Sequence, residues 1–486
     1  MITENMITEN ISTNNVFKKI LIANRGEIAL RIVRCCAEMD IRSVAVYTEP
    51  DRYGLHVKRA DEAHFIGDDP LAGYLDARRL VNLAAETGCD AIHPGYGFLS
   101  ENAEFSRICN ARGIAFIGPS GDVISRMGDK TEARAAMIAA GIPVTPGSNG
   151  NLVDINEALT VAESLGYPVM LKATSGGGGR GIRRCDTPQE LQQQYPRVIS
   201  EATKAFGSAE VFLEKCIVDP KHIEVQILAD KHGNAIHLFE RDCSIQRRNQ
   251  KLIEIAPSPQ LSDAQREYIG DLAVRAAKAV NYENAGTVEF LLTGEDFYFM
   301  EMNTRVQVEH TITEAITGVD IVREQIRIAA GLTLRYEQSE IRYRGYALQF
   351  RINAEDPKNN FLPSFGKISR YYAPGGPGVR TDTAIYTGYT IPPYFDSMCL
   401  KLIVWAMDWE DVLDRGSRAL EDMRLQGVKT TASYYQEILH CPEFRSGQFN
   451  TSFVPNHPEL LNYSEKRHPN DIALAIATAI AAHAGL

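Results

Sequence analysis

The chain has 486 residues, 44% of them hydrophobic and 23% charged, and its formal net charge is −11 at pH 7. This composition excludes collagenous, intrinsically disordered and disulfide-scaffold classes, and the length allows several domains. The negative charge argues against nucleic acid or an anionic membrane as the main partner.

The N-terminal segment does not resemble a targeting signal. Residues 1–10 are two copies of Met-Ile-Thr-Glu-Asn, without a basic region or an apolar core, and we expect a disordered tail over 1–15. No apolar stretch reaches the roughly 18 residues of a membrane span. Nine scattered cysteines without a C-x-x-C pair indicate a reducing compartment. We therefore expect a cytoplasmic protein without a membrane partner.

Residues 16–130 alternate short apolar runs with amphipathic segments. Helices are expected after Gly26 and over 75–87, and strands at 19–23, 43–47, 90–93 and 114–117. Such alternation predicts an open parallel sheet covered on both faces. Ligands of these sheets bind beyond the carboxyl ends of the strands, where residues 93–102 would lie.

A helix predicted over 130–140 leads to a glycine run at 176–181, which separates two strand-like segments. The run satisfies G-x-G-x-x-G but precedes a strand, whereas a dinucleotide-binding turn opens a helix. It therefore predicts the tip of a hairpin, which is either a flexible loop or a cover for phosphates. Lys172 before the run and Arg180 within it favour phosphate.

Two glutamates face each other in a hairpin predicted over 286–303. With the turn centred on Glu295, Glu289 lies across from Glu301, and Leu291 pairs with Phe299 beside them. Opposed carboxylates repel each other unless a cation lies between them. The alternative is that one glutamate is solvated or neutralised by a basic neighbour.

Asn303 adds a neutral oxygen on the same side of this hairpin. Two carboxylates and one amide oxygen suit Mg²⁺, with Mn²⁺ as a substitute, because hard cations prefer oxygen ligands. Large apolar neighbours around the glutamates favour this metal interpretation over solvation. The sequence therefore predicts a metal site at Glu289, Glu301 and Asn303.

Four long motifs, in this order along the chain, give a resemblance to a known family. They are Ile22-Ala-Asn-Arg-Gly-Glu-Ile28, Glu240-Arg-Asp-Cys-Ser-Ile-Gln-Arg-Arg-Asn-Gln-Lys251, Glu301-Met-Asn-Thr-Arg-Val-Gln-Val-Glu-His310 and Arg351-Ile-Asn-Ala-Glu-Asp-Pro357. Over about residues 18–455 the chain resembles the biotin-dependent carboxylases, an ATP-grasp family.

The resemblance implies an α/β fold in several regions. These are a tail (1–15), an N-terminal open parallel-sheet domain that precedes the ATP-grasp (16–130), a central ATP-grasp region with a glycine-rich lid (131–345, lid about 145–218), a mostly-β C-terminal biotin carboxylase domain (346–460) and a C-terminal helical tail (461–486). The tail helix either contacts a partner subunit or packs on its own domain, and the second option is expected.

The resemblance also implies site residues. ATP would be held by Lys130, Lys172, Gly177, Gly178, Gly179, Glu214, Lys215, Ile217, His222 and Gln246. The metal would be held by Glu289, Glu301 and Asn303. Bicarbonate and biotin would meet Lys251, Arg305, Gln307, Val308, Glu309, Arg351, Tyr96 and Gly97. Of these, Glu309 would be the base, Arg351 would face biotin, and Arg305 and Lys251 would complete the catalytic set.

The implied activity is carboxylation of biotin by bicarbonate and ATP. No lysine lies in an Ala-Met-Lys-Met setting, so the biotin carrier and the carboxyltransferase are expected on another chain, and a homodimer is expected. Residues 255–259 and 444–486 resemble the biotin carboxylase chains of two-subunit pyruvate carboxylases. Acetyl-CoA carboxylase, 2-oxoglutarate carboxylase and another ATP-grasp ligase are the alternatives.

Two positions depart from the family pattern. Asn249 replaces the usual histidine, which puts any titrating role there in doubt, and Ser175 replaces a glycine before the run. Arg34 and Glu38, four residues apart on the first helix, form a solvated pair or part of an interface.

Overall fold

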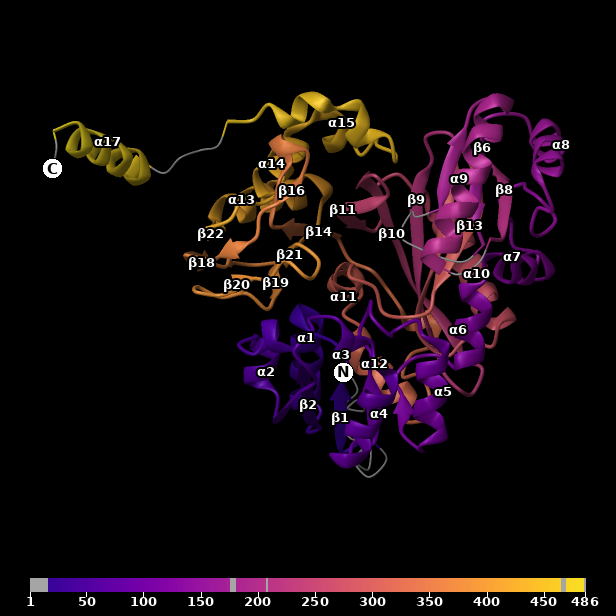
Figure 1. Ribbon diagram of the computed structural model, residues 1–486, viewed down its shortest axis with the longest axis horizontal. Helices are drawn as coiled ribbons and strands as arrows, with labels where there is room; N and C mark the ends of the chain where they lie inside the picture. Colours follow the sequence, from indigo (N-terminus) through magenta and orange to yellow (C-terminus); the bar gives the residue numbers. More distant parts are fainter. Residues whose placement is uncertain (1–15, 175–180, 207–208, 465–468, 485–486) are drawn as a thin grey trace, which may run out of the picture.

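The computed structural model describes residues 16–174, 181–206, 209–464 and 469–484 (Figure 1). The predicted tail over 1–15 and the glycines Gly177, Gly178 and Gly179 lie outside the described residues. None of the described helices is long and apolar enough to cross a membrane.

The N-terminal unit confirms the predicted parallel sheet. Its five strands run in the order β3-β2-β1-β4-β5 and pair in parallel. They are β1 (Lys19–Ile22), β2 (Arg42–Tyr47), β3 (Glu62–Phe65), β4 (Ala91–His93) and β5 (Ala115–Phe116). The edge strand β3 was not predicted, because its residues are only half-buried and carry two polar side chains.

Helices cover this sheet on both faces, and one of them differs from its prediction. They include α1 (Gly26–Glu38), α2 (Leu55–Arg59), α3 (Ala72–Leu75), α4 (Ala77–Glu86), α5 (Ala103–Ala111) and α6 (Gly121–Gly128). The helix expected over 75–87 is broken at Asp76, whose side chain accepts a hydrogen bond from the Arg79 amide and caps α4.

A separate three-stranded antiparallel sheet forms the region expected to be the lid. Its order is β7-β6-β8, with β6 (Val169–Ala173), β7 (Ile182–Cys185) and β8 (Val211–Lys215). Helices α8 (Ile155–Leu165) and α9 (Pro188–Phe206) pack on it and share its own small hydrophobic core, which includes Leu171, Leu191 and Val198. Figure 1 shows this unit at the upper right of the molecule.

One eight-stranded antiparallel sheet joins the central and C-terminal regions. The order is β13-β12-β9-β10-β11-β14-β21-β19. The strands are β9 (Lys221–Ala229), β10 (Ala235–Arg247), β11 (Gln250–Ala256), β12 (Asn284–Thr293), β13 (Asp296–Asn303), β14 (Tyr346–Asn353), β19 (Val379–Thr383) and β21 (Met398–Ala406). Hydrogen bonding between β11 and β14 therefore continues the sheet across position 345.

Helices flank this sheet, and short strands complete the C-terminal region. The helices are α7 (Lys130–Ala139), α10 (Asp263–Ala279), α11 (His310–Thr317), α12 (Ile321–Ala329), α13 (Trp409–Asp422), α14 (Ala432–His440), α15 (Pro442–Arg445) and α16 (Phe453–Asn456). The strands are β15 (Glu355–Asp356), β16 (Leu362–Pro363), β17 (Gly366–Lys367), β18 (Arg370–Tyr372), β20 (Thr390–Ile391) and β22 (Arg424–Gln426).

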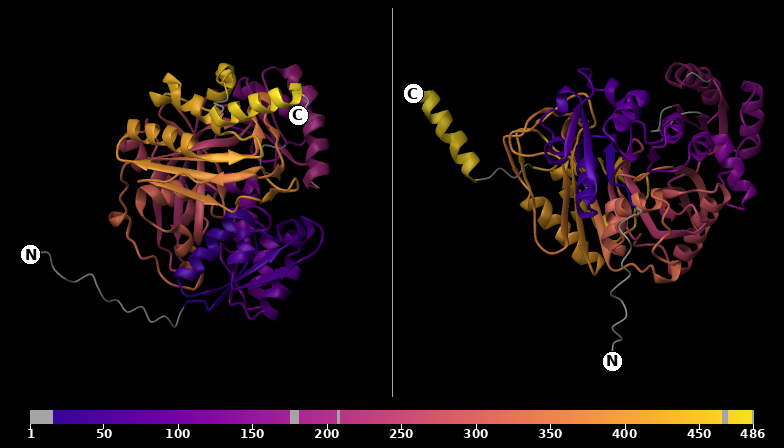
Figure 2. Two further views of the ribbon diagram at one scale, coloured as in Figure 1. Left: turned by 90° about the vertical axis from the view of Figure 1, so that its left-hand side faces the viewer. Right: turned by 90° about the horizontal axis from the view of Figure 1, so that it is seen from below.

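The N-terminal unit docks beneath the large sheet through a shared hydrophobic core. Ile28 and Ile32 of α1 lie in one cluster with Leu228 of β9 and Ile321 and Val322 of α12. Apolar burial of this kind fixes the relative positions of the packed elements. The left view of Figure 2 shows the indigo N-terminal unit below the large sheet.

We expected the C-terminal helix α17 (Pro469–Ala484) to pack on its own domain, but in the structure it does not. Figures 1 and 2 show it apart from the rest of the molecule. Its apolar side chains Leu474, Ile476 and Ile480 are 68%, 55% and 64% exposed. Within the described chain, nothing covers this apolar helix.

Candidate active site

A cleft of about 1100 Å³ lies where the N-terminal unit, the lid sheet and the large sheet meet. Every predicted site residue that the structure describes lines it. These are Tyr96, Gly97, Lys130, Lys172, Glu214, Lys215, Ile217, His222, Gln246, Lys251, Glu289, Glu301, Asn303, Arg305, Gln307, Val308, Glu309 and Arg351. Residues far apart in the sequence therefore converge on one cleft, as expected.

In the structure Glu289 lies opposite Glu301 as predicted, but the position of the turn and the residue pairs beside the glutamates differ from the prediction. The turn contains two residues, Gly294 and Glu295, because Thr293 pairs with Asp296. Phe290 pairs with Phe299, so the expected pairing of Leu291 with Phe299 is wrong. A bulge that leaves one extra residue, Met300, on β13 then restores the pairing of the two glutamates.

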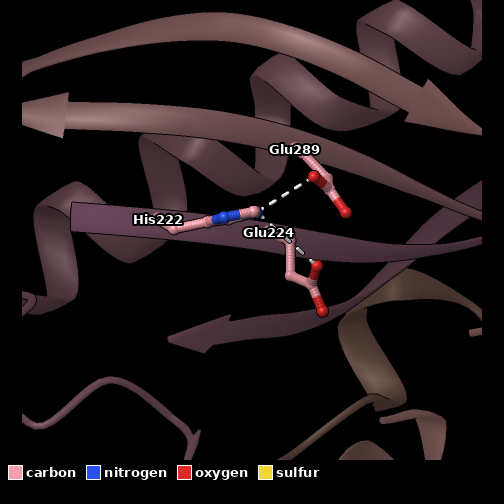
Figure 3. Close-up of side chains that lie close together, drawn as sticks. All are labelled: His222, Glu224 and Glu289. Carbon is pink, nitrogen blue, oxygen red and sulfur yellow. Dashed lines mark ion pairs between the residues drawn. The ribbon is translucent and has the colours of Figure 1, made fainter. Parts of the chain in front are cut away.

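Glu289 accepts hydrogen bonds from three site residues. The donors are Lys251 Nζ at 2.9 Å, Asn303 Nδ2 at 2.9 Å and Gln307 Nε2 at 2.8 Å. His222 Nε2 lies 3.0 Å from the other carboxylate oxygen, and Figure 3 shows His222 of β9 paired with Glu289 of β12 and with Glu224 of β9. Burial opposes ionisation, but Lys251 and His222 hold the pKa of Glu289 well below its usual value.

Glu301 has the opposite electrostatic environment. Burial and the negative charge of Glu289 raise the pKa of Glu301, which Lys130 only partly offsets. A divalent cation between the two carboxylates would remove this repulsion. Asn303 directs its Nδ2 to Glu289 and its Oδ1 to Arg305, so its amide would turn over to give such a cation an oxygen ligand. The residues present therefore fit a magnesium ion. His222, Glu224 and Glu289 also lie close enough to share a metal, although Lys251 supplies the positive charge there.

Lys251 is the central cation of the site. Its ammonium donates to Glu224 at 2.6 Å, to Glu289 at 2.9 Å and to Glu309 at 2.7 Å, which uses all three protons. Burial alone would lower the pKa of Lys251, but the three carboxylates raise it well above its usual value. Lys251 therefore remains charged at any physiological pH.

Glu309 lies between two cations. It accepts from Lys251 and, at 3.0 Å, from Arg351 Nη2. Burial would raise the pKa of Glu309, yet Lys251 and Arg351 lower it, so the carboxylate is ionised. Arg351 Nε also donates to the fully buried Glu254. This second partner fixes the plane of the guanidinium.

Arg305 connects the hairpin of β12 and β13 with the N-terminal unit. Its Nε donates to Glu101 at 2.8 Å and its Nη2 donates to Asn303 Oδ1 at 2.9 Å. Glu101 lies at the end of the predicted ligand-binding segment 93–102. The N-terminal unit therefore contributes directly to the charged cleft.

The end of the cleft beside the three-stranded sheet contains several basic residues, two of which contact the same glutamate. Lys172 of β6 pairs with Glu214 of β8, and Arg134 of α7 lies 3.4 Å from the same carboxylate. Burial lowers the pKa of Lys130, at the start of α7. Lys215 donates to the Gly166 and Tyr167 carbonyls, at 2.8 and 3.2 Å. Anionic phosphates would suit this basic end of the cleft.

Asn249 occupies a tight turn between β10 and β11. Arg247 pairs with Gln250, so Arg248 and Asn249 form a two-residue loop with φ values of 50° and 62°. Asparagine tolerates this left-handed conformation better than most residues. The backbone thus accounts for asparagine at this position, which still lines the cleft.

Asn24, in the turn after β1, holds the segment that carries Tyr96 and Gly97. Its Nδ2 donates to the Pro94 carbonyl at 2.7 Å and to the Tyr96 carbonyl at 2.8 Å. Gly95 has φ +63°, and a Cβ there would lie 2.8 Å from the Asn24 side chain. This close approach requires glycine.

Sequence reasoning missed the carboxylates that pair with the predicted cations: Glu101, Glu224 and Glu254. A signal for Glu224 existed, because His222, Glu224 and Gln226 alternate with Ile223, Val225 and Ile227 along β9. Such alternation puts three polar side chains on one face of a strand. For Glu254 and Glu101 no comparable local pattern exists, since their partners lie on other elements.

Arg241 is a buried cation that contacts residues of the site. Fully buried, it donates to Glu224 at 2.6 Å, Gln307 at 2.6 Å and Gln226 at 2.7 Å, and also contacts two threonines. Burial would raise the pKa of Glu224, but Arg241 and Lys251 lower it to about 2. The guanidinium thus offsets a charge that could not otherwise be buried.

We predict that Arg241→Met lowers the free energy of unfolding by about 3–5 kcal/mol, because Glu224 loses a buried partner. Arg52→Met is the control, since Arg52 forms an exposed pair with Glu49 and should show no measurable change. Denaturant unfolding measures both. Equal stabilities of Arg241→Met and wild type would contradict the prediction.

Three family models cover most of the chain. "Biotin carboxylase, N-terminal domain" matches residues 16–124, "Carbamoyl-phosphate synthase L chain, ATP binding domain" matches 129–337 and "Biotin carboxylase C-terminal domain" matches 349–456. The three matched ranges correspond to the N-terminal unit, the central region and the C-terminal region of the fold.

Relatives match along nearly the whole chain. The 2-oxoglutarate carboxylase small subunit of Hydrogenobacter thermophilus is 54% identical over 472 residues, which cover 97% of this chain and 100% of that protein. A pyruvate carboxylase subunit of Methanothermobacter thermautotrophicus is 51% identical over 443 residues, covering 91% of this chain and 90% of the relative.

A solved structure shows the same fold. The biotin carboxylase domain dimer of the Hydrogenobacter thermophilus 2-oxoglutarate carboxylase, in complex with MgADP, ADP and bicarbonate, is 55% identical to this chain. It covers 93% of this chain and 100% of its own, with a TM-score of 0.91.

The fold and the charged cleft together define an ATP-grasp enzyme, an ATP-dependent ligase. The chain belongs to the biotin carboxylase family, whose members are components of biotin-dependent carboxylases.

Proposed function

We propose that this protein carboxylates biotin on a separate carrier protein, using ATP and bicarbonate, as the biotin carboxylase component of a 2-oxo acid carboxylase. The observation that carries the proposal is the position of Glu309, a buried carboxylate between Lys251 and Arg351. A base next to a bicarbonate-binding lysine and a biotin-facing arginine suits both halves of the reaction.

The nucleotide would bind at the basic end of the cleft. Lys130 and Lys172 would contact phosphates, while Glu214, Lys215, Ile217, His222 and Gln246 would line the rest of the nucleotide site. Glu289, Glu301 and Asn303 would hold Mg²⁺, which when bound neutralises charge on the phosphates. The lid sheet would close over them.

In the first step Glu309 would accept the proton of bicarbonate. A bicarbonate oxygen then attacks the γ-phosphorus of ATP, the bond from this phosphorus to ADP breaks, and carboxyphosphate forms. Lys251 and Arg305 would stabilise the charge that develops on the reacting groups. Bicarbonate that draws Lys251 away from Glu309 would raise the pKa of the carboxylate and make it a better base.

In the second step carboxyphosphate breaks into CO₂ and phosphate inside the cleft. Phosphate would take the proton from the ureido nitrogen of biotin, and this nitrogen then forms its bond to CO₂. Arg351 would donate to the ureido oxygen and stabilise the enolate. Tyr96, Gly97, Gln307 and Val308 would complete the bicarbonate and biotin surroundings.

The test is ATP hydrolysis by the purified chain with and without bicarbonate, and with and without free biotin. We expect hydrolysis that requires bicarbonate and rises with biotin. Turnover that rises with ammonia and not with biotin would instead identify an ATP-grasp ligase of the carbamoyl phosphate type. No hydrolysis above background with all reactants would refute the proposed function.

The final acceptor proposed is 2-oxoglutarate, with pyruvate as the second candidate. The resemblance of residues 255–259 and 444–486 favours pyruvate, but the small subunit of 2-oxoglutarate carboxylase matches more of this chain. A match over 472 of 486 residues leaves 14 unmatched, so it must extend into residues 461–486, which include α17. Co-purification of the biotinylated partner, followed by assays with both oxo acids, would identify the acceptor.

A homodimer is proposed to form at the face that carries Arg34 and Glu38. These residues line a second cavity of about 400 Å³ together with Arg31, Glu314 and Arg380. Glu38 lies 3.6 Å from Arg323, so the expected solvated pair with Arg34 is replaced by a contact with α12. Sedimentation analysis of Arg34→Glu against wild type would test this interface.

We predict that Glu301→Gln raises the Mg²⁺ concentration for half-maximal activity by about ten-fold or more, because one ligand charge is lost. Glu295→Gln, at the exposed turn of the same hairpin, is the matched control and should leave the Mg²⁺ dependence unchanged. A Mg²⁺ titration of ATP hydrolysis measures both. Unchanged dependence in both Glu301→Gln and Glu289→Gln would disprove the metal site.

A further inference from the structure

Lys401 is a fully buried lysine beside the proposed biotin-facing arginine. On the large sheet it pairs with Arg351 of β14 on one side and with Asp382 of β19 on the other. Its relative exposure is 0%. Burial of an ammonium is costly unless the charge is paired and its protons are used in hydrogen bonds.

The ammonium contacts two groups that belong to other regions of the fold. It donates to the Val308 carbonyl at 3.0 Å, and it lies 3.0 Å from Glu27 Oε1. Glu27, on α1, accepts in turn from the hydroxyl of Tyr96. One side chain of the C-terminal region therefore joins the loop after β13 to the N-terminal unit.

Lys401 does not itself line the cleft, whereas Glu27, Tyr96, Val308 and Arg351 do. It cannot touch a ligand there and can act only through these neighbours. A lysine suits this role, because its compact charge has three donors that can serve a carbonyl and a carboxylate at once.

We propose that Lys401 is a positioning residue, which fixes the position of the Val308 carbonyl directly and that of the Tyr96 hydroxyl through Glu27. It would thereby keep the proposed bicarbonate and biotin sites correctly placed relative to each other beside Arg351. The proposal rests on the proposed function and deepens it. It assigns a role in substrate alignment to a residue outside the cleft.

The test compares Lys401→Met, Lys401→Arg and Glu27→Gln with wild type in steady-state assays. We expect Lys401→Met to raise the KM values for bicarbonate and for free biotin about ten-fold each, and to change the KM for ATP less than about two-fold. Glu27→Gln should raise the KM for biotin more than that for bicarbonate, since the Val308 contact remains. Lys401→Arg should restore part of the loss.

Arg266→Met is the matched structural control. Arg266 is a buried cation paired with Glu240 at 2.9 Å and does not line the cleft. We expect it to lower thermal stability without the selective rise in the two KM values. The same KM pattern in Arg266→Met would overturn the proposal, because general loosening would then explain it.

Crystal structures give a readout that does not depend on activity. In Lys401→Met, or in Glu27→Gln if Lys401→Met fails to fold, the Tyr96 hydroxyl should move from its wild-type position. Unchanged positions of Tyr96 and Val308 in Lys401→Met, or of Tyr96 in Glu27→Gln, would overturn the positioning role. A wild-type enzyme without bicarbonate-dependent hydrolysis would refute the proposed function alone.

Discussion

Glu309→Gln is expected to reduce bicarbonate-dependent ATP hydrolysis by about 10²–10⁴-fold, the range typical of a lost general base. Glutamine keeps the size, but its single amide oxygen can replace only one of the two carboxylate oxygens that accept from Lys251 and Arg351, and it cannot take a proton from bicarbonate. The loss should appear in kcat more than in the KM for ATP, since Glu309 contacts Lys251 and Arg351 and not Lys130 or Lys172, the lysines proposed to bind phosphate. Steady-state kinetics with varied bicarbonate measure it.

The control for this substitution is Glu324→Gln. Glu324 is fully buried and ion-paired with Arg335, but it lies on α12 and does not line the cleft. Activity within about two-fold of wild type is expected for the folded control. If Glu309→Gln retains more than about a tenth of wild-type activity, Glu309 is not the base.

Arg351→Met is expected to abolish the stimulation of ATP hydrolysis by biotin, with a loss of about 10²–10³-fold in biotin carboxylation. The guanidinium would donate to the enolate oxygen that forms when the ureido nitrogen loses its proton. Hydrolysis with bicarbonate alone should fall less, because Lys251 still contacts Glu309. Carboxybiotin formation from labelled bicarbonate measures the first effect, and phosphate release measures the second.

Arg351→Lys separates charge from geometry. Lysine lacks the planar fork in which Nε and Nη2 of Arg351 donate to Glu254 and Glu309, so little rescue is expected. Arg335→Met, which removes a cation from the pair with Glu324, serves as the control outside the cleft. Full biotin stimulation in Arg351→Met would disprove the assigned role.

Local patterns were sufficient for elements whose partners are close in sequence. The parallel N-terminal sheet followed from the alternation of strands and helices, and the hairpin that carries Glu289 and Glu301 followed from its two apolar strands. The pairing of these glutamates was nevertheless predicted with the turn centred on Glu295, whereas the turn residues are Gly294 and Glu295. A two-residue turn and a bulge at Met300 compensate each other, and no simple pattern in the sequence reveals such a compensation.

The remaining features depend on long-range packing. Lys251 meets Glu224 and Glu309 only because β9, β11 and the loop after β13 converge in the fold. The expected division near position 345 does not reveal that β14 hydrogen-bonds to β11 and continues the sheet. A strand order that departs from sequence order does not show which strands will be neighbours, so Glu224 was missed as a partner of Lys251 and Glu254 as a partner of Arg351.

The eight-stranded sheet carries Glu289 on β12, Lys251 on β11 and Arg351 on β14, while Lys172 and Glu214 belong to a small sheet with its own core. A rotation of the small sheet as a body would therefore leave the spacing between Glu289, Lys251 and Arg351 unchanged. If the nucleotide enters by such a rotation, substitutions in residues 140–154 and 216–220, which join the small sheet to the rest of the chain, should alter the rates of nucleotide binding and release and should leave the yield of carboxylated product per hydrolysed nucleotide unchanged.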